Sequence, residues 1–239
     1  ERIDVVWCLG GALCGRDEAA LQEVAQINIA QLERLQVPVC YVMGNHEFDL
    51  RASIRQDRFP LYDAVRNRGN WNTTASAEQP YFVRTVCGIP VVFFSEFAIT
   101  GDISAHERPD YQQVVLQLRE AIARHSGPVI TVSHYAYPGG QRATAWMGLQ
   151  LPLPPNVCLH LFGHAHIGDL VWNKENPWQR EHCVHGHSFR QYNISALETA
   201  RSAGSHSAFL EIGPNGPVSL RIRCHLERRW VDHFKLQTP

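Results

Sequence analysis

The sequence lacks several features that would assign it to a specialised class of protein. Its seven cysteines include no CxxC pair, so neither a zinc knuckle nor a dithiol redox motif is expected. A net charge of −1 gives no reason to expect nucleic acid or a membrane as a partner. The longest apolar runs, such as residues 89–94, are far too short to span a bilayer, and no charged start with an apolar core marks a signal peptide. The odd number and irregular spacing of the cysteines favour a reducing, cytoplasmic setting.

What the chain does contain is typical of a soluble α/β protein. Its 239 residues, 44% of them hydrophobic, suffice to bury a sizeable core. Short apolar runs predict buried strands, and amphipathic spacing between them predicts helices. We expect strands at 5–9, 38–43, 128–133 and 157–162, helices at 17–35, 51–68 and 109–125, a hairpin at 81–86 and 90–95, and a loop at 70–80. A second sheet formed by 192–197, 208–212 and 218–226 is expected to face the first within one domain spanning 1–239.

Three of the predicted strands end in asparagine or histidine. The segments that contain these strand ends are Gly44-Asn45-His46-Glu47, Thr131-Val132-Ser133-His134 and Gly163-His164-Ala165-His166. Open α/β sheets place their ligand sites at this C-terminal edge. Amide oxygens and imidazole nitrogens on rigid strand ends suit a divalent metal, and a neighbouring histidine can act as a general acid. For each motif alone, the simpler alternative is a polar turn after a strand.

Taken together, in this order and on strand ends, the three motifs resemble the calcineurin-like metallophosphoesterase family. The resemblance covers residues 4–166. It implies an α/β fold of four layers, α/β/β/α, in which helices flank a double β-sheet sandwich. It also implies a site for two divalent metals, often Mn, Fe or Zn, that cleaves phosphomonoesters or phosphodiesters. By this resemblance Asn45, His134 and His164 are ligands of one metal, His166 is a ligand of the other, and His46 is the proton donor or a transition-state stabiliser.

The sequence departs from the family pattern on its acidic ligands. The family opens with an Asp-x-His motif, which does not precede Asp4, so we expect the first strand to be missing. The family's next motif, Gly-Asp-x-x-Asp, aligns with residues 10–14, where Gly11 stands for the bridging aspartate and Cys14 for the second. A site of neutral ligands leaves the metal charge uncompensated and binds more weakly. We therefore expect one divalent ion, or two if upstream residues supply the missing ligands.

Other polar residues bear on the substrate. Arg142, in the long loop 137–155, is a candidate phosphate contact, and His187 is a candidate residue of the cleft. The spacing of His182, His185 and His187 is not a known ligand frame, so we interpret them as surface or pocket-rim residues. Tryptophans in predicted loops, Trp71 among them, are expected to pack over sheet edges.

Two functions of different classes remain open. The first is a metal-dependent phosphoester hydrolase, either a phosphatase or a phosphodiesterase, in which metal-activated water attacks phosphorus. Its substrate would be a phosphorylated small molecule or a nucleotide-type compound. The second is a catalytically impaired relative that serves as a scaffold or binding subunit. Gly11 and Cys14 favour the second, whereas retention of the strand-end histidines favours the first. The sequence does not indicate an oligomeric state.

Overall fold

The structure is a computed structural model in which residues 2–10, 18–44, 64–65, 67–74, 81–95, 109–134, 154–164, 179–184, 187–194, 197 and 205–236 are described. In chain order the elements are β1 (Val6–Cys8), α1 (Glu18–Glu33), β2 (Val39–Val42), β3 (Trp71–Thr74), β4 (Tyr81–Val86), β5 (Ile89–Phe94), α4 (Pro109–Ala123), β6 (Val129–Ser133), β7 (Val157–Phe162), β8 (Gln179–Val184), β9 (His187–Asn193), β10 (His206–Gly213), β11 (Gly216–Cys224) and β12 (Arg229–Lys235).

Most of the inner strands run parallel. Strands β1, β2 and β3 form one parallel sheet. A second sheet has the order β4-β5-β6-β7-β9-β8, in which β5, β6, β7 and β9 are parallel to one another and β4 and β8 are antiparallel edge partners. The hydroxyl of Ser95, just after β5, donates a hydrogen bond to the carbonyl of Met43, just after β2, at 2.7 Å. The carboxyl ends of β2 and β5 therefore meet at the same edge.

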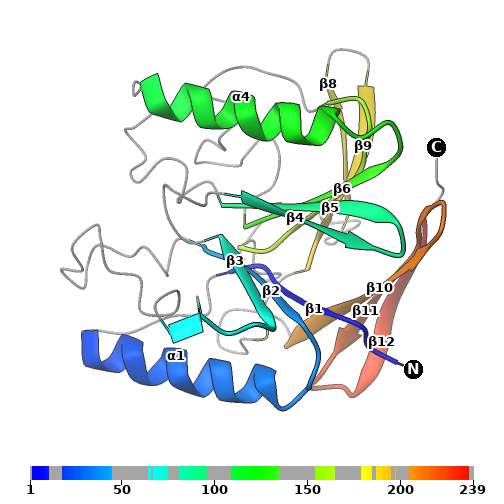
Figure 1. The fold of residues 1–239 in the computed structure, drawn as a ribbon. Helices are drawn as coiled ribbons and strands as arrows, with labels where there is room; N and C mark the ends of the chain where they lie inside the picture. Colours follow the sequence, from blue (N-terminus) through cyan, green and yellow to red (C-terminus); the bar gives the residue numbers. More distant parts are fainter. Residues whose placement is uncertain are drawn as a thin grey trace.

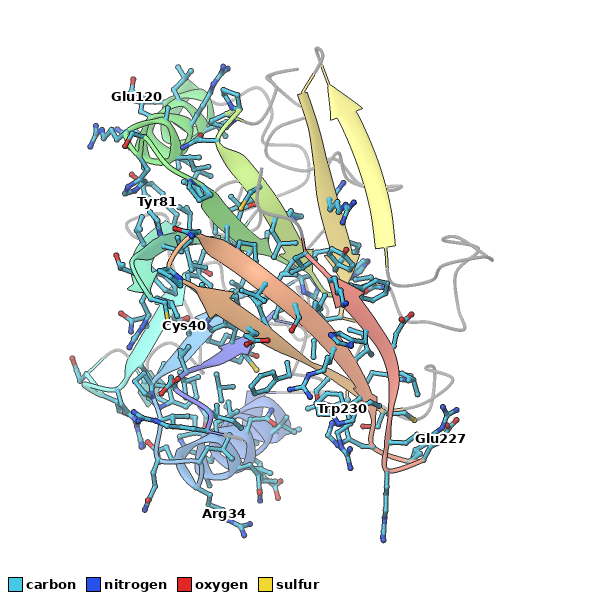
Figure 2. The ribbon with its side chains drawn as sticks, turned by 90° about the vertical axis from the view of Figure 1, so that its right-hand side faces the viewer. Arg34, Cys40, Tyr81, Glu120, Glu227 and Trp230 are labelled. Atoms are coloured by element: carbon cyan, nitrogen blue, oxygen red, sulfur yellow. The ribbon has the colours of Figure 1, made fainter. Side chains whose placement is uncertain are left out.

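A third sheet, β10-β11-β12, is antiparallel and lies across the inner strands on the right of Figure 1 and at the front of Figure 2. Leu220 and Ile222 on β11 are buried in one apolar cluster with Cys40 and Val42 of β2 and with side chains of β5, β6 and β7. This cluster is the interior of a double-sheet sandwich, and it confirms the expectation that the C-terminal sheet faces the first.

The two helices cover the opposite face of the inner strands. On α1, Ala25 and Ile29 lie one turn apart and are buried against Val39 and Tyr41 of β2. On α4, Val115, Leu118 and Ile122 form the apolar stripe against β5, β6 and β7. In Figure 1 α4 lies at the top and α1 at the bottom. The described residues thus account for three layers, helix, sheet and sheet, of the expected sandwich.

The side chain of Asn156, the residue just before β7, forms hydrogen bonds at the C-terminal end of α4. The amide nitrogen of Asn156 donates to the carbonyls of Ile122 and His125, both at 2.9 Å. The Ile122 carbonyl belongs to the last turn of α4, where backbone acceptors have no partner within the helix, and His125 lies two residues beyond the end of α4. The position of α4 is thereby tied to the strand that carries one of the candidate ligands.

Four strands, β3, β8, β9 and β12, were not predicted correctly, and no strand was expected over Gln179–Val184 of β8. Residues 71–74 were expected to be loop but form β3, because Val39–Val42 of β2 pairs with them in parallel register. Trp71 is consequently 7% exposed and packs on Tyr41 with ring centroids 6.4 Å apart. The strand expected at 192–197 is instead β9, which ends at Asn193 and pairs with β7 and β8, and β12 was not anticipated. The predicted helix at 51–68 lies largely outside the described residues.

Two cysteine thiols in the sandwich are protected from ionisation. Burial raises the pKa of Cys40 to about 11, although Arg84 opposes the shift, and burial likewise raises the pKa of Cys158 to about 11. Cys40 is fully buried and Cys158 half-buried, as expected for small apolar core residues. No helix within the described residues is both long and apolar enough to cross a membrane.

Candidate metal site at the carboxyl edge of the inner strands

Several parallel strands deliver polar residues to one edge. Thr74, Ser95, Ser133, His134 and Asn193 all lie at strand ends and are buried. The hydroxyl of Thr74 accepts a hydrogen bond from the Met43 amide at 3.0 Å, which joins β3 to β2 at that edge. Buried polar groups at the carboxyl ends of parallel strands are typical of a ligand site. None of these five residues is a carboxylate.

His134 is held in a defined orientation. It follows β6, is only 2% exposed, and its Nδ1 lies 2.6 Å from the carbonyl oxygen of Leu9 at the end of β1. A carbonyl oxygen can only accept, so Nδ1 carries the proton and Nε2 carries the lone pair of the neutral ring. Metal-binding histidines commonly have their other ring nitrogen fixed in this way. The Leu9 carbonyl is thus a site residue that side-chain patterns could not reveal.

His164 lies beside His134 in an unusual backbone conformation. The two ring centroids are 5.0 Å apart, and the ring planes make an angle of 68°. His164 is exposed and has φ of +61°, in the left-handed region that non-glycine residues rarely adopt. Strain of this kind persists where the surrounding structure holds a residue in place, and it is concentrated at functional sites. The structure therefore brings together two of the four predicted metal ligands.

Gly163 allows β7 to approach the end of β1. Its amide donates to the carbonyl of His134 at 3.2 Å. A Cβ atom at this position would lie 3.3 Å from the carbonyl oxygen of Leu9 and 3.8 Å from Nδ1 of His134. Glycine is therefore favoured here by close packing around the hydrogen bond that orients His134.

The other side of the edge is formed by backbone. Gly10, just after β1, has φ of +80°, and a Cβ there would lie 2.6 Å from the nitrogen of Gly44 and 2.7 Å from the carbonyl oxygen of Val42. Among the described residues at this edge, Gly10 and His164 are the ones with positive φ angles.

The remaining candidates fall outside what the structure describes. These are Asn45, His46, His166 and Arg142, together with the departures Gly11 and Cys14. His187 is the first residue of β9, and only its backbone is described. Within the described part of the chain, no group of three or more His, Cys, Asp or Glu residues could hold a metal ion. His134 and His164 thus form the described part of the site.

These two histidines fit a divalent metal. Their rings are adjacent, and the hydrogen bond to Leu9 fixes His134 in the neutral tautomer with its lone pair on Nε2. Neutral imidazole suits Zn, Fe and other first-row metals. The buried hydroxyls and amide around them provide no negative charge. The described set is consistent with the weak, neutral half-site that the sequence predicts.

One comparison identifies the family. The family model for calcineurin-like phosphoesterases matches residues 1–168, which include β1 to β7 and every predicted metal ligand. The chain belongs to the calcineurin-like phosphoesterase family. At this level it is a metal-dependent phosphoesterase domain of α/β sandwich fold that acts on phosphorylated substrates. No curated protein matches the sequence.

Proposed function

We propose that this chain hydrolyses phosphoesters with a single divalent metal held by Asn45, His134 and His164. The observation that carries the proposal is the orientation of His134, whose Nδ1 proton points at the Leu9 carbonyl and whose ring lies beside that of His164. A histidine with a purely structural role would not require a second histidine in a strained backbone conformation beside it. It would also not need to lie at the carboxyl edge of parallel strands, where ligand sites form.

A divalent metal bound there would supply Lewis acidity, which lowers the pKa of water and offsets charge that develops on the phosphoryl group. The protein residues have the remaining roles. The oxygen of a water forms a bond to phosphorus and releases one proton to solvent, while the bond from phosphorus to the leaving oxygen breaks. We assign to His46 the transfer of a proton from its ring to that leaving oxygen. We assign to Arg142 and His187 contacts with the non-bridging oxygens.

The substrate of this reaction is proposed as a phosphorylated small molecule or nucleotide-type compound. Both monoester and diester cleavage are compatible with the assigned roles. The cysteine pattern supports a cytoplasmic setting, where thiols with a raised pKa such as that of Cys40 stay reduced and unreactive.

A second candidate function is a scaffold or binding subunit that has lost hydrolysis. The specific observation in its favour is the glycine at position 11, where the family places the carboxylate that bridges two metals. Without that carboxylate, the buried strand-end residues of the described edge contribute no negative charge to a bound cation. The two candidates share the fold and differ in metal affinity and turnover.

The test is metal content and turnover measured on the same purified protein, in a form that carries its full natural N-terminus. An aryl phosphate and a bis-aryl phosphodiester are offered in Mn²⁺, and His46→Ala serves as the matched variant. We expect one metal per chain and hydrolysis of at least one substrate, abolished in His46→Ala while metal content is retained. A protein that binds no metal and turns over neither substrate is the scaffold.

A further inference from the structure

Strand β7 has an apolar pattern that does not define its own alignment. Its sequence is Val-Cys-Leu-His-Leu-Phe, so every residue except His160 is apolar and both faces of the strand can be buried. Its neighbour β6 has polar residues on one face only, Thr131 and Ser133. When both faces of a strand are apolar, hydrophobic burial selects its pairing register only weakly. Another interaction must then decide which residues of β6 and β7 lie opposite each other.

The observed register contains an irregularity. Val129 pairs with Val157, but Ile130 pairs with Leu159, so Cys158 is an extra residue on β7. After this bulge Thr131 lies opposite His160, and Ser133 lies opposite Phe162. The ladder then ends with the Gly163 amide donating to the His134 carbonyl. The bulge therefore determines how His164 is placed relative to His134.

His160 makes the polar contacts that fit this bulged register. It is 1% exposed, with Nδ1 2.8 Å from the Thr131 hydroxyl and Nε2 3.3 Å from the Ser133 hydroxyl. The rings of Phe94 and Phe162 also contact the His160 ring, each with its centroid 6.1 Å from that of His160. An alignment without the bulge would turn His160 to the opposite face of the sheet. There it would lie among the apolar side chains between the two sheets and lose both hydroxyls.

We propose that His160 is a positioning residue that locks the bulged register of β6 and β7 and thereby sets the spacing of His134 and His164. This inference rests on the proposed function for its effect on metal binding. A slip by one residue moves a strand by about 3.3 Å along its axis. That displacement is about two-thirds of the 5.0 Å between the two imidazole centroids, so it would change their spacing substantially. His160 is not one of the residues assigned to the metal or the substrate.

The test compares two variants. His160→Phe leaves the hydroxyls of Thr131 and Ser133 buried beside an apolar ring, and we expect it to lower both stability and Co²⁺ affinity. The triple variant Thr131→Val, Ser133→Ala, His160→Phe removes every polar member of the set. Because the two hydroxyls are then no longer buried against an apolar ring, its melting temperature should rise above that of His160→Phe. Its Co²⁺ affinity, followed by visible absorption, should remain at least about tenfold below that of the unmodified protein.

A second readout reports the register without any metal. Hydrogen exchange at the Gly163 amide measures its bond to the His134 carbonyl, and we expect faster exchange in both variants while β10, β11 and β12 are unchanged. Val115→Ala, a cavity variant on α4 packed over the same strands, is the control: it should lower stability and leave Co²⁺ affinity and Gly163 protection intact.

The outcomes separate the two claims. If the unmodified protein binds no Co²⁺, the proposed function is wrong, and hydrogen exchange at Gly163 alone decides whether His160 locks the register. If the triple variant recovers Co²⁺ affinity and Gly163 protection along with its stability, His160 is an ordinary satisfied core residue and the positioning role is wrong. The role is equally overturned if Val115→Ala weakens Co²⁺ binding as much as His160→Phe does.

Discussion

The two sides of the candidate site differ in composition: side chains form one side and backbone forms the other. On the side formed by the ends of β6 and β7, which we term the histidine half, oriented side chains meet at the edge: His134 is fixed by the Leu9 carbonyl and His164 lies beside it. On the side formed by the ends of β1 and β2, the glycine half, backbone meets backbone, and there is no room for a Cβ at Gly10. Among the residues that the structure describes, candidate ligand side chains lie on the histidine half and none lies on the glycine half, whose proposed ligand Asn45 falls outside the described residues.

This difference has an electrostatic consequence. A divalent cation near two neutral imidazoles gains donor bonds but no charge neutralisation, whereas a carboxylate about 4 Å away would contribute several kcal/mol even at an effective dielectric of 20. By the resemblance set out from the sequence, the family's bridging carboxylate would stand at position 11, directly after Gly10, where this chain has glycine. The predictions below alter one half at a time.

Removing the ligand from the histidine half should have the largest effect. His134→Gln removes the ring that is proposed to bind the metal and that contacts Leu9. The loss of the metal would remove several kcal/mol of phosphoryl charge stabilisation. We expect turnover of the preferred aryl phosphoester to fall by about 1000-fold or more. His233→Gln, a change at an exposed histidine on β12, is the control and should keep full activity. Equal losses in both variants would contradict the assignment of His134.

Filling the glycine half should mainly affect folding. In Gly10→Ala the added methyl overlaps the backbone of Val42 and Gly44, and the left-handed φ is strained as well. Together these effects should lower the free energy of unfolding by about 2–5 kcal/mol, measured by urea denaturation. Gly88→Ala is matched to it, since Gly88 has φ of +83° but no atom within 4 Å of its Cβ position. It should lose only about 1–2 kcal/mol. Equal losses in the two variants would mean that the close approach at Gly10 has no energetic role.

Adding charge to the glycine half should strengthen metal binding. We expect Gly11→Asp to raise Mn²⁺ affinity by about tenfold, since a carboxylate offsets part of the metal charge. Isothermal titration with Mn²⁺ measures the change. Gly11→Asn has nearly the same shape without the charge and should give a much smaller gain. If the asparagine variant binds as tightly as the aspartate variant, charge is not what the glycine half lacks.

The smallest effect is expected in the core that both halves share. Because burial raises the pKa of Cys40 from 9.0 to about 11, the unfolded thiol ionises before the folded one as the pH rises. Stability from this group is complete below pH 9 and is lost between pH 9 and pH 11, by about 1 kcal/mol at pH 10. Urea denaturation at pH 8 and pH 10 measures the loss, and Cys40→Ala should reduce it. An unchanged pH dependence in Cys40→Ala would show that other groups cause the alkaline loss.

Prediction from sequence succeeded where the signal is local. The apolar runs that became β2, β6 and β7 and the amphipathic stripe of α4 stand out within a short window of sequence, because burial on one or two faces sets their composition. The order of the strand-end motifs sufficed to predict the family, which the match over residues 1–168 confirms. The ligand roles of Asn45, His134, His164 and His166 all stay predictions, and Asn45 and His166 also lie outside the described part of the chain.

Prediction failed where pairing partners are distant in the sequence. The segment Trp-Asn-Thr-Thr of β3 contains no run of apolar residues, and only the edge of β2 makes it a strand. Strand β12 was missed for a different reason: its partner β11 is its neighbour in the chain, but Arg229–Lys235 contains three charged residues and no long apolar run. Propensity is a weak guide for such strands, since the partner strand supplies most of the stabilisation.

The sequence by itself determined the family, the core strands and the identity of the histidines that reach the carboxyl edge. Only the tertiary structure decided how those histidines are held: by the carbonyl of Leu9, by the left-handed backbone of His164 and by a bulge at Cys158 that His160 fits. The physical reason is that each of these features depends on which strands lie side by side. A backbone carbonyl, a φ angle and a pairing register are not tied to any particular amino acid. Composition and spacing therefore could not specify them.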